Sequence, residues 1–401
     1  MLSEYQLLRL PELPIRSTLY CLKPIGIGSE FVESLTSFIS RLACEHRVSL
    51  SCLLEEAIAP LTGKQFIING GARVLSGAFS GYFRAINSTG GTAAEWIAYL
   101  EHLTMRSDLS CLTLRKWRYV FSQRELLRPN RAWCPECYGD QLSTSGILYD
   151  PLIWSMATVT VCAKHRRALL FNCQHCYQKL FHLSPRARPG HCYRCRGSLK
   201  RRSLPTRAPG EWELWTARAV AQIIACTRPG EETSPSNDII ARTTSAIVEG
   251  LFNGNAARFA QAIGKQKSTV WGWCHNGSRM LLNDLLNLCY CLHIDPSDFL
   301  CGTISIKHLK ADALRPSVIK MRQLTRRRQL NSKAVEQQLR EALEHGRTGS
   351  MQKVAQSLGF HKRFLYRHFP DLCPAIAYEH KQVSTTNSSK RPQVSQIRQS
   401  G

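Results

Sequence analysis

Four pairs of metal-binding side chains lie between residues 131 and 195. Two residues separate the members of each pair, and the pairs are Cys134 with Cys137, Cys162 with His165, Cys173 with Cys176, and Cys192 with Cys195. This spacing lets a tight turn aim both side chains at one ion, and zinc takes about four such ligands in a tetrahedron. Taken in chain order, the pairs predict two structural zinc ions, the first held by three cysteines and a histidine and the second by four cysteines.

Other interpretations of these residues stay open. The thiols could be buried or joined as disulfides, although four such pairs in a short stretch favour metal. The pairs could also interleave, so that the first and third share an ion. Three histidines near the pairs are candidate substitute ligands, namely His175, His182 and His191. A catalytic ion is disfavoured, because a shell filled by four protein ligands leaves no open position.

The segment before these pairs is expected to be helical. In residues 13–59, Gly28-Ser29 can open a helix whose apolar side chains recur at helical spacing, and a second helix follows after a short turn. Further on, the box Thr92-x-x-Glu95 predicts the start of another helix. Between Cys137 and Cys162 the gap is longer than in a zinc ribbon and leaves room for a hairpin.

Charge indicates the kind of partner. The formal charge is +24, and most of it lies in two blocks, with 13 basic and 3 acidic residues in 128–202 and 19 basic and 6 acidic residues in 302–401. Residues 1–127 and 203–301 are nearly neutral. Two blocks of almost one sign predict a polyanion partner, which in a cytoplasm means nucleic acid. The alternative is a basic surface that serves solubility alone.

The first predicted DNA reader lies in residues 255–300. Its order is helix, glycine turn, helix, which resembles the phage-repressor class of helix-turn-helix, with a recognition helix from Gln266 to His275. The side chains expected near phosphates and bases are Lys265, Lys267, Ser268, Thr269 and His275.

The second predicted reader lies in residues 332–380, inside the more basic block. The donors on and before its second helix are His361, Lys362, Arg363, Arg367 and His368, and the upstream patch is Arg326, Arg327 and Arg328. For both readers the alternative is a plain helical hairpin within a bundle.

These patterns predict a mainly α, multi-domain protein. The expected parts, in chain order, are an N-terminal helical, helix-turn-helix-like domain, tandem zinc-binding ribbons, a helical domain with the first reader, a basic region with the second reader, and a disordered tail, at residues 1–127, 128–202, 211–301, 302–380 and 381–401. The chain has no apolar run of about 18 residues for a membrane span, and its 10 cysteines outside the pairs fit free thiols in a reducing compartment. We therefore expect a cytoplasmic, nucleoid-associated protein without a membrane partner.

Three stretches carry a recognisable combination of motifs. They are Leu13-Pro14 with the run from Glu33 to Ala43, the motif from Arg131 to Cys137 with the metal-ligand pairs that follow it, and the run from Val354 to Ile376. In combination they resemble the TniQ/TnsD family, the target-selection proteins of heteromeric DNA transposons. The eight expected zinc ligands carry over position by position.

The resemblance implies a role without catalysis. Such proteins mark an insertion site and recruit an AAA+ ATPase regulator (TnsC-like), which in turn recruits the transposase. Some read double-stranded attachment DNA themselves, while others ride on an RNA-guided CRISPR complex. Two readers of its own favour the self-reading, TnsD-like branch, and the nearly neutral N-terminal domain is the part expected to meet the ATPase.

Two further classes of function are weighed against this one. A zinc-stabilised transcriptional regulator would share the basic blocks and the helix-turn-helix modules. An enzyme is less favoured, since the 29 Asp and Glu residues form no convincing cluster for catalytic metal. Neither Gly63-Lys64 nor Gly264-Lys265 has the surroundings of a phosphate-binding loop.

Overall fold

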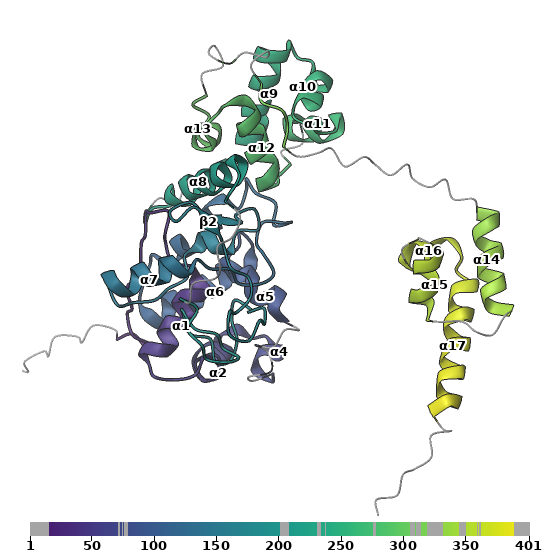
Figure 1. Ribbon diagram of the computed structural model, residues 1–401, viewed down its shortest axis with the longest axis horizontal. Coiled ribbons are helices and arrows are strands. Elements are labelled where there is room, and N and C mark those ends of the chain that lie inside the picture. The colour runs from purple at the N-terminus through teal and green to yellow at the C-terminus, as the bar shows by residue number, and fades with distance from the viewer. Residues whose placement is uncertain are drawn as a thin grey trace, which may run out of the picture. The chain divides into compact units, whose positions relative to one another are not determined.

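The structure is a computed structural model, and it describes residues 16–70, 73, 75, 79–200, 208–230, 234–236, 238–275, 278–304, 309, 314–318, 332–344, 350–358, 360 and 362–388. The chain divides into two compact units, Met1–Met321 and Arg322–Gly401. Each unit has a hydrophobic core of its own, and Figure 1 labels helices in both. The described residues are mainly helical, so the predicted mainly α, multi-domain class is confirmed.

Short helices and helical turns build the N-terminal part of the larger unit. They are α1 (Leu35–Glu45), α2 (Leu50–Leu53), the π-helical turn η1 (Leu54–Ile58), α3 (Ala59–Thr62), α4 (Gln65–Ile68), α5 (Ser80–Arg84), the 3-10 turn η4 (Ala85–Asn87), α6 (Gly91–Thr104), and the 3-10 turns η5 (Leu109–Leu112) and η6 (Arg115–Trp117). Every residue of α1 from Leu35 to Ala43 is buried. Helix α1 therefore runs through the core rather than across its surface.

The expected helix start at Gly28-Ser29 is wrong. Gly26 and Gly28 have φ of +71° and +77°, and the Ser29 hydroxyl donates to the Gly26 carbonyl at 2.7 Å. This geometry makes a turn, because left-handed φ values end or interrupt a helix. The true cap is Ser34, whose side chain accepts a hydrogen bond from the N–H of Ser37.

The expected capping box at Thr92 and Glu95 is also wrong. Helix α6 begins at Gly91 with Gly90 as its cap, so Thr92 lies inside the first turn. The Glu95 carboxylate forms an ion pair with Lys64 instead. A tertiary partner has taken the acceptor that the local motif would have used.

The central region is a helix followed by knuckle-like turns. Its elements are α7 (Pro135–Thr144), the 3-10 turn η7 (Leu152–Ser155), and the antiparallel strands β1 (Val161–Cys162) and β2 (Arg167–Ala168), in the register Val161 to Ala168 and Cys162 to Arg167. The hairpin expected between Cys137 and Cys162 is wrong, because Pro135 starts a helix at its first position. The two-stranded hairpin lies after this gap, where β1 pairs with β2.

Residues on both sides of the expected boundary at 127/128 share one core. Glu33 bridges Pro151 and Leu127 bridges Met156, both in antiparallel fashion. Leu127 and Trp133 belong to the same buried cluster as α1. The boundary marks a change in charge, and the packing continues across it.

Among the residues that the structure describes, six helices complete the larger unit. They are α8 (Glu211–Ala225), α9 (Ile239–Phe252), α10 (Ala256–Ala262), α11 (Lys267–His275), α12 (Leu282–Leu292) and α13 (Pro296–Cys301). The predicted order from residue 255 to 300 is confirmed, with Asn255 capping α10 and Asp295 capping α13. Helix α9 was not foreseen, and it packs against both α10 and α11.

In the described part of the smaller unit there are four helices. They are α14 (Ser332–Glu344), α15 (Met351–Leu358), α16 (Lys362–His368) and α17 (Leu372–Ser388). Their core includes Leu339, Leu365 and Ile376, each fully buried. The tail expected to be disordered from residue 381 begins as part of α17, because extending a packed helix costs little once its first turns exist. Residues 389–401 lie outside the described residues.

Among the described residues, no helix is both long and apolar enough to cross a membrane.

Candidate metal centres and nucleic-acid interface

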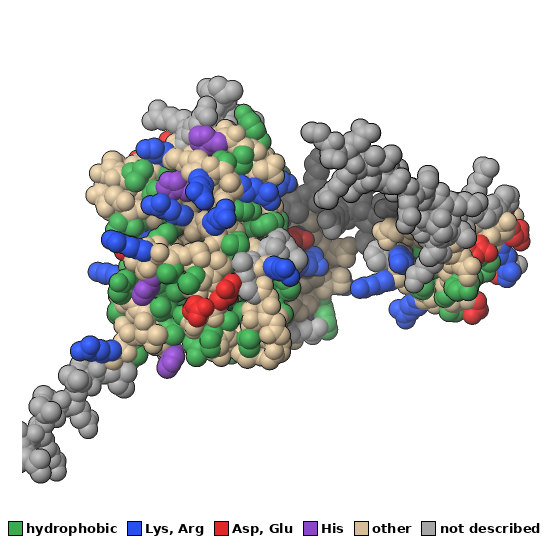
Figure 2. Space-filling view, turned by 90° about the horizontal axis from the view of Figure 1, so that it is seen from below, with side chains coloured by type: hydrophobic (Ala, Val, Ile, Leu, Met, Phe, Trp, Pro, Cys, Tyr) green, Lys and Arg blue, Asp and Glu red, His purple; other side chains and the backbone are tan. Residues whose placement is uncertain are grey.

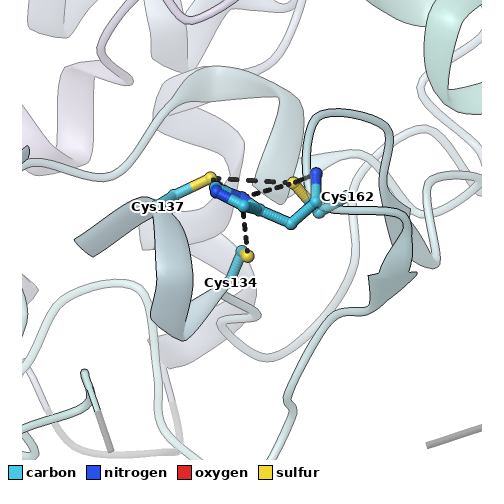
Figure 3. Close-up of side chains that lie close together, drawn as sticks. Cys134, Cys137 and Cys162 are labelled. Atoms are coloured by element: carbon cyan, nitrogen blue, oxygen red, sulfur yellow. Dashed lines mark hydrogen bonds between the residues drawn. The ribbon is translucent and has the colours of Figure 1, made fainter. Parts of the chain in front are cut away.

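The first two pairs come together as one cluster. The Sγ atoms of Cys137 and Cys162 lie 3.6 Å apart, and Nδ1 of His165 lies 3.5, 3.3 and 3.6 Å from the sulfurs of Cys134, Cys137 and Cys162. Figure 3 shows the three sulfur atoms converging from the start of α7 and from the β1 turn. The pairing in chain order is therefore the arrangement found, and the interleaved alternative is not.

The spacing of these atoms fits a four-coordinate metal. A Zn–S bond of about 2.3 Å places the corners of a tetrahedron about 3.8 Å apart, close to the separations found here. A disulfide would require about 2.05 Å, and every cysteine of the chain is a free thiol. The cluster can hold a metal ion, and the three cysteines are at most 5% exposed. Such a closed, thiolate-rich shell is typical of structural sites rather than catalytic ones.

A second layer of side chains orients the first cluster. Nε2 of His165 lies 3.2 Å from a carboxylate oxygen of Asp140 on α7. This contact fixes Nδ1 as the atom facing the cysteines, as in carboxylate–histidine–metal arrangements. A hydrogen bond from Lys164 lowers the pKa of Asp140, so the carboxylate remains charged. Asp140 was not singled out from the sequence, although its place one turn after Cys137 is a usable signal.

A buried ion pair ties the first cluster to α1. Arg131 forms an ion pair with Asp150 at 2.6 Å and donates to the Tyr138 hydroxyl at 2.7 Å. The backbone N–H of Asp150 donates to the Ser37 hydroxyl on α1 at 2.9 Å. Burial alone would lower the pKa of Arg131, but the charge of Asp150 outweighs it and raises that pKa. The residues that frame the cluster thus also hold the N-terminal core.

The last two pairs form a separate all-cysteine cluster. Cys173 lies 3.7 Å from Cys195, and Cys176 lies 3.7 Å from Cys192, measured between sulfurs. All four sulfurs lie within 4.8 Å of one another. Each pair is a knuckle whose backbone closes on its first cysteine, with Tyr177 N–H on the Cys173 carbonyl at 2.8 Å and Arg196 N–H on the Cys192 carbonyl at 2.9 Å. This cluster is also able to hold a metal ion.

The three candidate substitute ligands are occupied elsewhere. Nε2 of His175 faces the Ser198 carbonyl at 3.1 Å, and Nδ1 of His191 faces the Pro189 carbonyl at 3.1 Å. His182 faces the Arg128 carbonyl at 3.1 Å, and burial lowers its pKa to about 4. None of them belongs to either cluster.

A comparison with protein families finds a match over one part of the chain. The family model described as TniQ matches residues 24–169. Residues 24–169 therefore form a TniQ domain. The match covers α1 to α7, β1 and β2 and all four residues of the first cluster, and it ends before the second cluster. A comparison with curated proteins finds no match.

This domain sets the broad functional context. A TniQ domain associates the chain with DNA transposition, in a target-selection or adaptor role. Because the match spans the expected boundary at 127/128, the first cluster is part of the TniQ domain itself. The match ends at residue 169, so the roles of the residues beyond it are argued from the geometry.

The first predicted reader presents part of its expected contact set to solvent. Lys267, Ser268 and His275 are exposed on α11, and Thr269 is half-buried. Lys265 is different, because it forms an ion pair with Asp284 on α12 and its side chain is only 17% exposed. This pairing ties Lys265 to α12 and leaves it poorly placed for a phosphate.

One exposed aromatic side chain of α11 escaped the sequence analysis. Trp271 is 48% exposed and stacks on His275 with ring centroids 4.8 Å apart. Its neighbours Val270 and Trp273 are the buried anchors of the helix. A tryptophan between two anchors, outside the apolar spacing, was the available signal.

The second predicted reader exposes cations on α16. Lys362, Arg363, Arg367 and His368 are exposed, while Leu365 of the same helix is fully buried. The His368 ring also lies 4.3 Å from that of Phe364. The remaining predicted contacts of this module lie outside the described residues, namely Arg326, Arg327, Arg328 and His361.

Proposed function

We propose that this TniQ-family protein selects the target site of a DNA transposon by binding attachment-site DNA and recruiting an AAA+ ATPase regulator. The observation that carries the proposal is the joining of a TniQ domain to two helix-turn-helix modules in one chain. An adaptor placed only by another complex has less need of readers of its own. The protein acts by binding and does not catalyse strand transfer.

The two clusters hold structural zinc in this proposal. The ligands are Cys134, Cys137, Cys162 and His165 in the first site and Cys173, Cys176, Cys192 and Cys195 in the second. Zinc suits thiolate and imidazole donors at tetrahedral spacing better than magnesium or calcium, which prefer oxygen. Each ion fixes chain segments too short to make a core of their own.

Two helices divide the reading of DNA. Helix α11 and helix α16 each follow the turn of a helix-turn-helix, which is the position that enters a major groove. Basic side chains supply affinity through phosphates, and Figure 2 shows Lys and Arg side chains gathered on the displayed face of the larger unit, with few acidic ones. The TniQ domain is left for the ATPase.

The decisive experiment is a footprint of the purified full chain on the attachment region, without guide RNA. Protection of one sequence over scrambled DNA is the expected result. Arg363→Ala and Arg367→Ala should each cost about 1–3 kcal/mol on that sequence if they reach base edges. Exposed Arg340, already paired with Glu336 at 2.8 Å on α14, gives the control substitution Arg340→Ala.

Other outcomes favour the other functions. Binding that never distinguishes sequences at any salt concentration would contradict self-reading and favour an adaptor for an RNA-guided CRISPR complex. Specific binding to a promoter, without any interaction with the ATPase, would instead favour a zinc-stabilised transcriptional regulator.

A further inference from the structure

A short basic run of the TniQ domain lies beside the first reader. Residues 115–124 contain Arg115, Lys116, Arg118 and Arg124 and no Asp or Glu. The average charge of residues 1–127 is close to zero, so this run does not stand out in a domain-wide count. It forms η6, the turn of residues 118–120 and the bridge residue Phe121.

The backbone of this segment is joined to the chain just after α11. Phe121 and Met280 form a parallel bridge, in which the Met280 N–H donates to the Val120 carbonyl at 3.0 Å and the Ser122 N–H donates to the Met280 carbonyl at 2.9 Å. Phe121 is 1% exposed and Met280 is fully buried. The reader is therefore anchored to the TniQ domain at a defined register.

The bridge brings two cations of different segments onto one surface. Arg118 is half-buried, with its guanidinium 4.6 Å from the ring centroid of Tyr119. Tyr119 is 42% exposed, and Arg279 is exposed beside the bridge. A hydrogen bond from Arg118 lowers the pKa of Tyr119, and the charge of Arg279 acts in the same direction, which agrees with their closeness.

Arg118 and Arg279 can bind a phosphate, whereas the neighbouring cations Arg115 and Lys116 are bonded to backbone carbonyls. Arg115 donates to the Thr89 carbonyl at 2.9 Å and Lys116 donates to the Cys226 carbonyl at 2.5 Å, so both stabilise the fold. Within the part of the chain that the structure describes, neither Arg118 nor Arg279 forms an ion pair with a carboxylate. Two arginines and a phenol thus face solvent together, and all three can donate to phosphate oxygens.

Arg279 lies close enough to the recognition helix α11 for both to contact the same stretch of duplex. Three residues lie between His275, the last residue of α11, and Arg279, so their Cα atoms are at most roughly 14 Å apart. Phosphates of one strand follow at about 3.4 Å along the duplex axis. A duplex with α11 in its groove therefore has backbone phosphates within reach of this surface.

We propose that Arg118, Tyr119 and Arg279 form a phosphate clamp, by which the TniQ domain itself holds the duplex read by α11. The clamp rests on the proposed function, since it takes α11 as a DNA reader. It adds a second task for the TniQ domain, which the proposed function leaves to the ATPase. Its contacts are to the sugar–phosphate backbone, so they supply affinity and orientation rather than sequence preference.

The test compares salt dependence in the full chain. The double variant Arg118→Gln with Arg279→Gln is measured against Lys23→Gln with Arg47→Gln, which removes the same charge from two exposed side chains that precede and follow α1. Binding to cognate and scrambled duplexes is followed by fluorescence anisotropy over a series of salt concentrations. Thermal melting and metal content show that both variants are folded.

The clamp predicts a loss of about two units in the salt slope for the first variant, since each lost phosphate contact removes about one. Affinity for both duplexes should fall by the same factor, and the control pair should keep the wild-type slope. An unchanged slope with intact sequence preference overturns the clamp and leaves the proposed function standing. A wild-type protein that binds duplex without preference contradicts self-reading, while the slope still decides the clamp. If the wild-type protein binds no duplex even at low salt, both the clamp and the proposed function fail. If the double variant loses only ATPase binding, the surface belongs to a protein partner and the clamp is wrong.

Discussion

At the scale of single residues, the buried ion pair between Arg131 and Asp150 makes the region of the first cluster sensitive to substitution. The Arg131 side chain is 6% exposed and that of Asp150 is 17% exposed. Removing one partner of a buried pair leaves a charge without compensation, which typically costs about 3–5 kcal/mol. Asp150 also links Tyr138 to Arg131, so its loss disturbs two donors at once.

Asp150→Asn should therefore lower the free energy of unfolding by about 3–5 kcal/mol, as measured by urea denaturation. Asp238→Asn is the matched control, because Asp238 pairs with Arg242 at 2.9 Å and both side chains are more than half exposed. Exposed pairs contribute roughly 0–1 kcal/mol. Equal effects of the two substitutions would show that Asp150 does not act through its buried partner.

His182 gives the larger unit a dependence on pH. Its folded-state pKa is about 4 because burial disfavours the charged ring, while an exposed histidine has a pKa near 6.5. Between these values the unfolded chain binds more protons, so stability falls as the pH decreases from 6.5 towards 4. By pH 5.5 the loss from this residue is on the order of 1 kcal/mol.

His182→Gln should flatten this part of the stability curve, because the amide can still donate to the Arg128 carbonyl and does not titrate. Urea denaturation at pH 7.0 and at pH 5.5 measures the difference between the two proteins. A variant with the same loss as the wild type over this range would place the titration elsewhere.

At the scale of elements, helix starts could be predicted from the sequence where the capping residues lie next to the helix. Asn255 and Asp295-Pro296 are caps whose signals lie within a few residues, and helices α10 and α13 begin directly after them. Pro135 carries the same kind of signal for α7, but the gap between Cys137 and Cys162 was interpreted only as room for a hairpin. The misplaced start at Gly28-Ser29 reflects two left-handed glycines, whose φ values depend on tertiary context.

The two clusters were predictable as ligand sets for a different reason. Spacing of two residues between ligands is a property of the turn itself, so each pair can be found without knowing the fold. The second layer depends on packing, and Asp140 reaches His165 only because α7 exists. The continuous core across residue 127 could not be predicted from the sequence either. The charge composition changes at that residue, but the packing continues across it.

The clusters should differ in what they hold together. Cys134→Ser should unfold much of the TniQ domain, because the first cluster closes on α7 and on the core around α1. Cys195→Ser affects an exposed knuckle and should leave the helical signal of α1 to α6 largely intact. Each variant should lose about one zinc from an expected two, measured by elemental analysis and circular dichroism.

Cys52→Ser is the control for this comparison, since Cys52 is an exposed thiol outside both clusters. It should keep the full metal content and the wild-type melting temperature. A folded TniQ domain without metal would contradict a structural role of the first site.

At the scale of the whole molecule, the averaged charge of a segment concealed its distribution. Residues 1–127 are nearly neutral, and on that ground they were expected to meet a protein rather than DNA. The run from Arg115 to Arg124 is nonetheless basic, and it lies against the chain that follows α11. Removing residues 1–60 would not test its role, because α1 belongs to the core.

The two units allow a cleaner division of labour to be tested. Each has its own hydrophobic core, so a chain ending at Met321 should fold without the smaller unit. The removed part carries 15 Lys and Arg against 5 Asp and Glu, together with α16. The truncated protein should keep both metal ions and still bind the ATPase, while its salt slope on any duplex drops by several units, since each lost phosphate contact removes about one.

Sequence preference separates the two readers in the same experiment. If α11 reads part of the attachment site, the truncated protein should still prefer cognate over scrambled DNA, with a weaker preference than the full chain. Anisotropy at one fixed salt concentration, with both duplexes, measures this ratio, and a pull-down with the purified ATPase measures recruitment. Complete loss of preference would assign sequence reading to the smaller unit alone. Loss of recruitment with preference retained would move the ATPase contact from the TniQ domain to residues beyond 321.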